Sequence, residues 1–172
     1  MRETGLLHVY YGDGKGKTTA ALGAALRACG CGLPVVVAQF LKDAPSGEVA
    51  ALAQLPGAEL LRCGAGFSPG LSAAEDQTLR QNSGELLARA FARAREAGLL
   101  VLDEVLDACR LGFLEEEELL RRIDSRPPAL ELIVTGHAPI CAVLDRADYI
   151  TRMCKERHPY DRGLSARRGI EY

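Results

Sequence analysis

The chain has 172 residues, of which 48% are hydrophobic, and a formal net charge of -2. We therefore expect residues 1–172 to form one domain around one core, without the basic surface that would bind nucleic acid or an anionic membrane. No stretch is apolar for long enough to span a bilayer, and the six cysteines lack CxxC spacing, so we expect a cytoplasmic protein with reduced thiols.

Short apolar runs alternate with longer periodic segments in the first part of the chain, which is typical of βαβ units around a parallel sheet. An alanine-rich helix is predicted from Lys17 to about Cys29, because Gly30 supplies a helix C-terminus. A glycine-rich loop at residues 12–16 precedes this helix. Strands are predicted around these two segments, at residues 6–11, 34–41 and 58–62.

The second part of the chain continues this pattern with longer helices. Ser72 and Glu75 form an S-x-x-E capping box, and apolar residues then recur at helical spacing until Gly98, which predicts a long helix packed on the sheet. The basic stretch 155–172 is expected to be either a solvated tail or a lid over the site. The other predicted elements are a buried central strand at 99–103, a helix at 115–124, and strands at 130–135 and 149–153.

The glycine-rich loop carries the strongest local signal, Gly-Asp-Gly-Lys-Gly-Lys-Thr-Thr, between a strand and a helix, as a phosphate-binding loop requires. We expect its backbone N–H groups to turn inward around phosphate oxygens, with the positive end of the helix dipole behind them. Lys17 and Lys15 would neutralise phosphate charge, and the Thr18 hydroxyl would ligate Mg²⁺. The loop is a tight variant, because only three residues separate Gly12 from Gly16. The residues expected to bind the nucleotide here are Gly12, Asp13, Gly14, Lys15, Gly16, Lys17, Thr18 and Thr19.

The strand at 99–103 ends in Asp103 and Glu104, which resembles a Walker B strand that delivers a carboxylate to the metal. Because side chains alternate along a strand, the two carboxylates point in different directions, and the sequence does not assign which one ligates Mg²⁺ directly. Together with the loop, this strand predicts an α/β fold of the three-layer P-loop NTPase type, RecA-like, with a mostly parallel central sheet of about five or six strands.

Several blocks of sequence, in a fixed order, carry a resemblance that covers nearly the whole chain. They are GDGKGKTTAA (12–21), VVAQFLK (36–42), GE (47–48), GAGF (64–67), VLDEV (101–105), RPP (126–128), VTGHAP (134–139), AD (147–148) and HPYDRGLSARRGIEY (158–172). With these blocks the chain resembles the ATP:corrinoid adenosyltransferases of the P-loop type. The tight loop combined with this C-terminal segment makes the resemblance specific.

The resemblance implies that ATP serves as an adenosyl donor. In this family a reduced cobalt(I) corrinoid attacks the ribose 5′-carbon, a cobalt–carbon bond forms, and triphosphate leaves intact. Lys15 and Lys17 would then be catalytic, because with Mg²⁺ and the loop amides they stabilise charge developing on the leaving group. ATP and a corrinoid (cobalamin or a cobyrinic acid derivative) are the implied substrates, and Mg²⁺ is the implied cofactor. A reductant, for which a flavodoxin-like protein is one candidate, and a second copy of the chain in a homodimer are the implied partners.

Three further residues are candidates for the site. Phe67 matches the family's aromatic residue near the lower face of the cobalt, where it would act as a wedge that displaces the axial ligand; a Phe that anchors a short loop in the core is the alternative. His137 would contact phosphate or ribose, or be an ordinary loop histidine. Arg27, on the first helix, would reach the nucleotide, or be a surface arginine.

Two other functions stay open on the residues alone. A kinase or ATPase with a phosphate loop would direct its catalytic groups at the γ-phosphate and at a hydroxyl or water nucleophile. A non-catalytic module would bind nucleotide or corrinoid without forming a cobalt–carbon bond. The product separates these functions, because adenosyl transfer releases triphosphate whereas a kinase or ATPase releases ADP.

Overall fold

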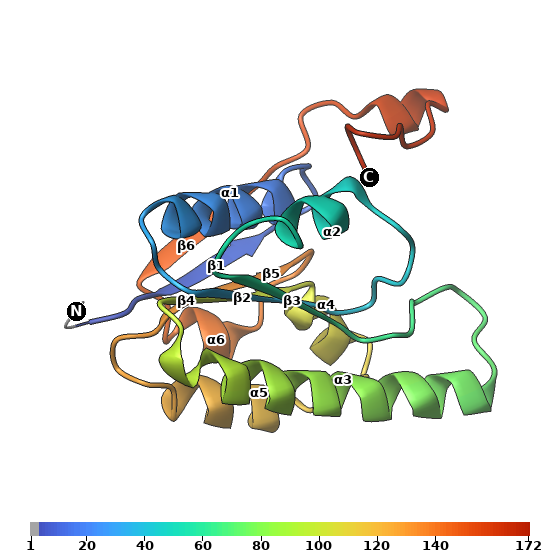
Figure 1. The fold of residues 1–172 in the computed structure, drawn as a ribbon. Coiled ribbons are helices and arrows are strands. Elements are labelled where there is room, and N and C mark those ends of the chain that lie inside the picture. The colour runs from blue at the N-terminus through green and yellow to red at the C-terminus, as the bar shows by residue number, and fades with distance from the viewer. Residues whose placement is uncertain (1–3) are drawn as a thin grey trace.

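The structure is a computed structural model that describes residues 4–172. Within these residues it contains one sheet of six strands with helices on both faces (Figure 1). The strands are β1 (Leu7–Tyr11), β2 (Val35–Gln39), β3 (Ala58–Arg62), β4 (Leu99–Asp103), β5 (Glu131–Gly136) and β6 (Tyr149–Arg152). The α-helices are α1 (Lys17–Gly30), α2 (Gly47–Leu52), α3 (Ala73–Arg93), α4 (Val105–Arg110), α5 (Glu116–Asp124) and α6 (Cys141–Leu144), and short 3₁₀ helices lie at Ala94–Glu96 and Pro159–Arg162. None of the helices described combines the length and apolar composition needed to cross a bilayer.

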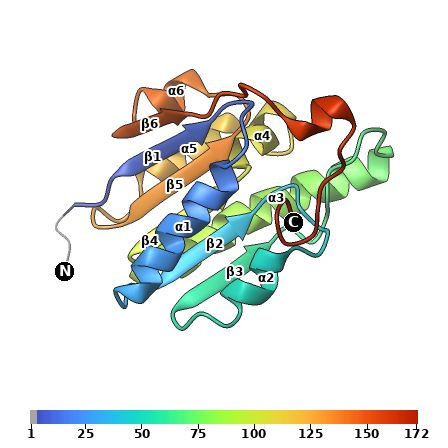
Figure 2. The ribbon, with the colours of Figure 1, turned by 90° about the horizontal axis from the view of Figure 1, so that it is seen from above.

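The strands lie in the order β3-β2-β4-β5-β1-β6, and all paired neighbours run parallel. All six carboxyl ends therefore meet at one edge of the sheet, next to the C-terminal segment drawn in red in Figure 2. Because β5 lies between β1 and β4, the loop after β1 and the acidic pair after β4 are two strand spacings apart, about 10 Å. The register sets Tyr11 opposite Gly136 and Gln39 opposite Asp103, so the segments after these residues converge at the same edge.

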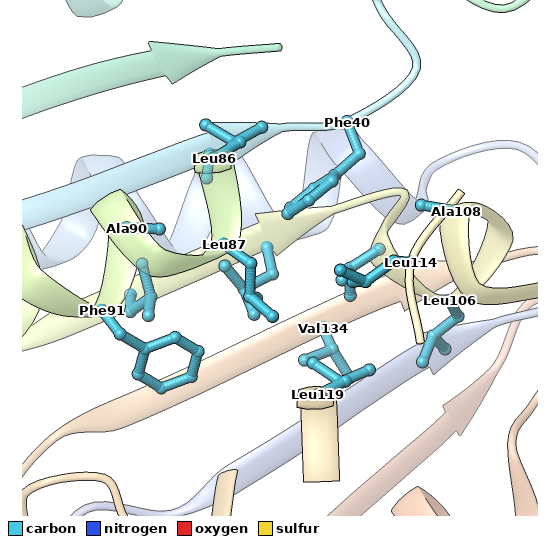
Figure 3. Packing of buried hydrophobic residues seen from close by; sticks show 14 of the residues in the cluster. Phe40, Leu86, Leu87, Ala90, Phe91, Leu106, Ala108, Leu114, Leu119 and Val134 are labelled. Atoms are coloured by element: carbon cyan, nitrogen blue, oxygen red, sulfur yellow. The ribbon is translucent and has the colours of Figure 1, made fainter. Parts of the chain in front are cut away.

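Buried side chains alternate between two hydrophobic layers, one on each face of the sheet. Val35 and Val37 of β2 belong to the layer under α1 and α2, whereas Val36 and Ala38 belong to the larger layer that packs against α3, α4 and α5. Since both faces are covered, the central strands form a rigid platform for the edge that carries their carboxyl ends. Figure 3 shows part of the larger layer, including Leu86, Leu87, Ala90 and Phe91 from α3, Leu119 from α5 and Val134 from β5.

The predicted strands and the helices predicted at 17–29 and 115–124 agree with the structure to within one or two residues. The long helix predicted to continue until Gly98 ends earlier, because α3 stops at Arg93 and a 3₁₀ turn follows at Ala94–Glu96. The capping box is confirmed, because the Ser72 hydroxyl accepts from the Glu75 N–H and the Glu75 carboxylate accepts from the Ser72 N–H. The fold class is also confirmed, and the sheet is wholly parallel across its described strands, where the sequence predicted it as mostly parallel. Sequence reasoning missed α2, α4 and α6, because helices of four to six residues are too short to show a helical period.

Candidate active site

The glycine-rich loop packs tightly against the segments that follow β5 and β6. Gly12 has φ of 121° and donates its N–H to the carbonyl oxygens of Gly136 (3.2 Å) and His137 (3.1 Å). A Cβ atom on Gly12 would lie 2.2 Å from the carbonyl oxygen of Met153, so a residue with a side chain does not fit there. Gly16, with φ of 115°, then turns the chain into α1.

The amides of this loop differ from the sequence prediction in one respect. We expected the loop N–H groups to face phosphate, but Gly12 and Gly14 donate theirs to backbone carbonyls, in the case of Gly14 to Met153 at 2.8 Å. The N–H groups of the first turn of α1, at Lys17, Thr18 and Thr19, have no acceptor within the helix and so are available to an anion. An anion bound here would therefore lie on the positive end of α1.

The side chain of Lys17 folds back over the glycine-rich loop and bonds its backbone. Its Nζ donates to the carbonyl oxygens of Gly12 (2.7 Å) and Gly14 (2.9 Å). Burial lowers the pKa of Lys17, while the nearby carboxylates, Asp107 first among them, oppose that shift. Lys15 is exposed and lines the same pocket of about 390 Å³, together with Asp13, Gly14 and the start of α1. The ammonium group of Lys17 can exchange loop carbonyls for phosphate oxygens without leaving this pocket.

Asp103, at the end of β4, ties three elements together at the floor of the site. Its side chain is fully buried, and its Oδ1 accepts from the hydroxyls of Thr18 and Thr135, both at 2.9 Å. The Thr135 hydroxyl also accepts from the backbone N–H of Glu104 at 2.8 Å. The first turn of α1 is thereby joined to the carboxyl ends of β4 and β5.

Glu104 presents its carboxylate differently from its neighbour Asp103. Its φ of 63° is rare for a residue other than glycine and turns the chain from β4 into α4. The side chain is 26% exposed and lines the pocket that contains the glycine-rich loop. Burial raises the pKa of Glu104, and Asp103 adds to this shift while Lys42 opposes it.

Lys42, a few residues after β2, reaches both carboxylates. Its Nζ lies 2.7 Å from Oδ2 of Asp103 and 3.4 Å from Oε1 of Glu104, and it donates to the Thr18 hydroxyl at 3.2 Å. Burial alone would lower the pKa of Lys42, but attraction to the two carboxylates outweighs it and the pKa is raised. A positive charge therefore lies among three oxygen atoms of the kinds that ligate Mg²⁺.

His137 is positioned beside the loop by a buried acid. Asp107 of α4 is 4% exposed, and its Oδ2 lies 2.9 Å from both the backbone nitrogen and Nδ1 of His137. The imidazole itself is largely exposed and lines the same pocket as Lys15 and Lys17. The structure thus brings His137 to the predicted phosphate site, with a ring orientation fixed by Asp107.

Phe67 lies on a second cavity, of about 640 Å³, that adjoins the first. The ring is 41% exposed and lies 5.7 Å, centroid to centroid, from the buried ring of Phe113. The backbone N–H of Phe67 donates to the carbonyl of Leu41 at 3.1 Å, which sets this loop beside Lys42. Lys42 lines both cavities, so the two meet at its side chain.

The C-terminal segment lies over the carboxyl edge of the sheet (Figure 2). Residues 169–172 form walls of a pocket of about 330 Å³ with the first turn of α1, Lys42 and α2. Arg167, which could have contacted an anion, is paired with Glu171 instead, at 3.1 Å. Where this segment begins, the backbone N–H of Lys155 donates to the carboxylate of Asp13 at 3.2 Å.

The structure does not bring Arg27 to this site. It lies in the last turn of α1 and lines a different pocket with His8 and Glu131. Ten positions of helix separate it from Lys17, which corresponds to about 15 Å along the axis.

Three residues of the site were missed as such by sequence reasoning, namely Lys42, Asp107 and Thr135. Lys42 occurs in the block VVAQFLK, and Asp107 follows Asp103 by four positions. Their place in the site becomes clear only once β2 is known to pair with β4, which brings the segment after β2 beside the end of β4. Thr135 ends a buried apolar strand, where a hydroxyl needs a partner. Such a residue is worth testing as a site residue wherever a strand enters a nucleotide-binding edge.

Comparison with known proteins identifies relatives across the whole chain. The sequence model of the family described as ATP:corrinoid adenosyltransferase BtuR/CobO/CobP matches residues 3–172. The chain is 34% identical over 178 residues to the corrinoid adenosyltransferase CobA of Salmonella typhimurium, covering 100% of this chain and 88% of the relative. It is 33% identical over 172 residues to a corrinoid adenosyltransferase of Pseudomonas aeruginosa, covering 99% of this chain and 85% of the relative.

Solved structures with a similar fold are more distant in sequence. A KaiC-like protein of Pyrococcus horikoshii superposes with a TM-score of 0.53 at 17% identity, covering 91% of this chain and 75% of that one. The cytoplasmic domain of EssC gives a TM-score of 0.51 at 14% identity, covering 100% of this chain and 39% of that one. At these identities the similarity concerns the fold alone.

Proposed function

The chain belongs to the ATP:corrinoid adenosyltransferase family, and we propose that the site described above transfers the 5′-deoxyadenosyl group of ATP to the cobalt of a reduced corrinoid. The observation that supports this assignment to particular residues is that two cavities adjoin each other and share Lys42 and Glu171 in their walls. One cavity contains the glycine-rich loop with Lys15 and Lys17, the other contains Phe67, and Lys42 lines both. A triphosphate in the first cavity and a corrinoid in the second would bring the ribose between them.

The main electrostatic requirement of the reaction is to stabilise the negative charge that develops on the triphosphate leaving group. Cobalt(I) supplies the electron pair of the new cobalt–carbon bond, and the bond between the 5′-carbon and the triphosphate oxygen breaks with its electrons passing to that oxygen. Lys17, Lys15 and the N–H groups of the first turn of α1 stabilise the charge that develops there. No general base is needed, because the nucleophile carries no proton to remove.

The acidic pair and the Thr18 hydroxyl fit a magnesium ion. Their oxygens are hard donors, and they already surround a cation in the form of the Lys42 ammonium. Glu104 is the more accessible ligand, whereas buried Asp103 orients the Thr18 hydroxyl. Within residues 4–172 no group of three or more acids, histidines and cysteines is arranged to hold a metal by itself. Proteins commonly bind Mg²⁺ through one or two carboxylates together with substrate phosphates. When bound, Mg²⁺ would neutralise part of the triphosphate charge.

The corrinoid would lie against Phe67, whose half-exposed ring is available to a planar ligand on one side while Phe113 supports it on the other. We assign Phe67 the role of the wedge that displaces the axial ligand of the cobalt. His137, held by Asp107, would donate to phosphate or ribose on the other side of the site.

Several broader features belong to the same proposal and rest on the family resemblance and the composition. They are a single domain over residues 1–172, a homodimer, a cytoplasmic location, and an external reductant, with a flavodoxin-like protein as one candidate. All six cysteines lie within the described residues as free thiols, which supports a reducing compartment. Light scattering of the purified chain would test the dimer, and reduction of cob(II)alamin by candidate flavoproteins would test the reductant.

The decisive experiment is a product assay. The protein is mixed with ATP, Mg²⁺ and chemically reduced cob(I)alamin or cobyrinic acid diamide, and the phosphate products are separated. We expect inorganic triphosphate in amounts equal to the adenosylated corrinoid. ADP without a cobalt–carbon bond would indicate a kinase or ATPase, and tight binding without either product would indicate a non-catalytic module.

A further inference from the structure

Lys42 occupies the space between the ligands that the proposed magnesium site would use. Its ammonium group contacts the carboxylates of Asp103 (2.7 Å) and Glu104 (3.4 Å) and the hydroxyl of Thr18 (3.2 Å). We propose that Lys42 is an exchangeable cation of the site: it neutralises the acidic pair while no metal is bound, and the divalent cation displaces its ammonium group toward the triphosphate. This inference rests on the proposed metal site.

The charges around Lys42 explain why a cation must be held there. Asp103 is fully buried, and Glu104 follows it directly, so two carboxylates lie together at the end of β4. A buried carboxylate without a counter-charge is strongly unfavourable. The hydroxyls of Thr18 and Thr135 donate hydrogen bonds to Asp103 but bring no charge, so the positive charge comes from Lys42.

The same contacts imply competition with a divalent cation. The ammonium group and a metal ion would use the same oxygens of Thr18, Asp103 and Glu104 and cannot occupy the space among them together. A divalent ion carries twice the charge of an ammonium group and favours carboxylate oxygens, so it would displace the ammonium group of Lys42. Exchange also requires that the ammonium group can move away from the carboxylates. The Lys42 side chain is 26% exposed, so it can move without disturbing the core.

The displaced ammonium group would remain useful to the reaction. Lys42 lines the cavity of the glycine-rich loop, the cavity of Phe67, and the pocket closed by residues 169–172. Lys42 therefore lies where the cavity of the glycine-rich loop meets the cavity of Phe67, the region in which the bond to triphosphate would break. There it would add a third positive charge beside those of Lys15 and Lys17, at the end of the leaving group where negative charge first develops.

The test measures metal binding without ATP or corrinoid, so its failure and the failure of the proposed reaction are separate. Mn²⁺ is titrated into the wild-type protein and into Lys42→Met, and free Mn²⁺ is followed by electron paramagnetic resonance. We expect the variant to bind Mn²⁺ at least about tenfold more tightly, because the competing charge has gone. Unchanged or weaker affinity, or no Mn²⁺ bound by either protein, would overturn the exchange.

A second measurement separates this role from a merely structural one. At saturating Mg²⁺ and ATP, kcat of Lys42→Met should fall by about tenfold or more even though its metal affinity has risen. A residue that only supports the fold would lower both quantities, and an unchanged kcat would overturn the role of the displaced ammonium group. Arg146→Met is the matched control, because it also removes a cation paired with an aspartate, Asp124, but far from the site. Circular dichroism checks folding, and Lys42→Gln, which keeps a neutral donor, replaces the variant if Lys42→Met does not fold.

Discussion

The glycine-rich loop and the segment around Phe67 lie at the same edge of the sheet, but different kinds of contact hold them. The loop is fixed through backbone bonds from Gly12 and Gly14 and through the buried carboxylate of Asp103. Phe67 has one backbone bond, to Leu41, and a ring that is 41% exposed. The side of the site formed by the glycine-rich loop is thus fixed to the edge of the sheet, whereas the side formed by Phe67 is held by fewer, more exposed contacts.

This difference matches the demands of the two substrates. Electrostatic stabilisation of a leaving group works best when its donors are fixed beforehand, because nothing then has to reorganise during the reaction. A large planar corrinoid, by contrast, has to enter and leave, and segments with few buried contacts open at low cost in free energy. We infer that changes on the loop side should affect the chemical step, and that changes on the Phe67 side should affect how the corrinoid is presented.

The largest effect should come from Lys17→Ala on the loop side. Removing the ammonium group that bonds Gly12 and Gly14 should lower the rate of triphosphate release by roughly 10²–10³-fold, as loss of one fixed donor does elsewhere. The rate is measured with pre-reduced cob(I)alamin, and thermal unfolding reports whether the fold is kept. Arg146→Ala, distant from the site, should retain activity. A Lys17→Ala protein that still adenosylates at a near-normal rate would show that the loop does not bind the leaving group.

The loop side could largely be predicted from the sequence, because its signals are local. Strand, glycine turn and helix follow one another in residues 7–30, and each has its own residue preferences. The Asp103-Glu104 pair also ends a recognisable apolar strand. Helix geometry would even have excluded Arg27, since ten positions from Lys17 place it well beyond the first turn.

The rest of the site depends on contacts between distant parts of the chain. Lys42 meets Asp103 only because β2 pairs with β4, although β3 and the long helix α3 lie between them in sequence. Asp107 sits on α4, which is too short for its pattern to be recognised. The loop amides that were expected to face inward bond distant segments instead: Gly12 donates to Gly136 and His137 at the end of β5, and Gly14 donates to Met153 after β6. These partners lie more than 120 positions away in sequence, so no local pattern predicts the contacts.

An intermediate effect is expected from Phe67→Ala, on the more exposed side of the site. If the ring displaces the axial ligand, its loss should lower turnover that starts from cob(II)alamin by roughly tenfold, because reduction then becomes harder, and should change turnover from cob(I)alamin much less. The two rates are compared with the same protein preparation and with Phe67→Leu as a control of similar bulk. Equal losses with both corrinoids would contradict the wedge and leave Phe67 as a packing partner of Phe113.

The smallest effect concerns the end of the C-terminal segment, where exposed contacts among residues 167–172 close a turn. The hydrogen bond from Arg167, with a further backbone bond, lowers the pKa of Glu171 to about 2. Since the pKa of an unfolded Glu is about 4.3, the pair should stabilise this turn above that pH and lose this contribution as the pH falls toward 2. Hydrogen exchange of residues 167–172 should therefore be slower in the wild type than in Glu171→Gln at pH 6 and similar in both near pH 2.

Glu171→Gln also tests whether the C-terminal segment contributes to catalysis. Glu171 also lies close enough to Lys15 to interact with it electrostatically, so its carboxylate competes with triphosphate for that cation. Exposed ion pairs contribute little, and kcat/KM for ATP should change by no more than about threefold in Glu171→Gln. A loss as large as that of Lys17→Ala would mean that the C-terminal segment is as fixed a part of the site as the glycine-rich loop, and the contrast between the two sides would fail.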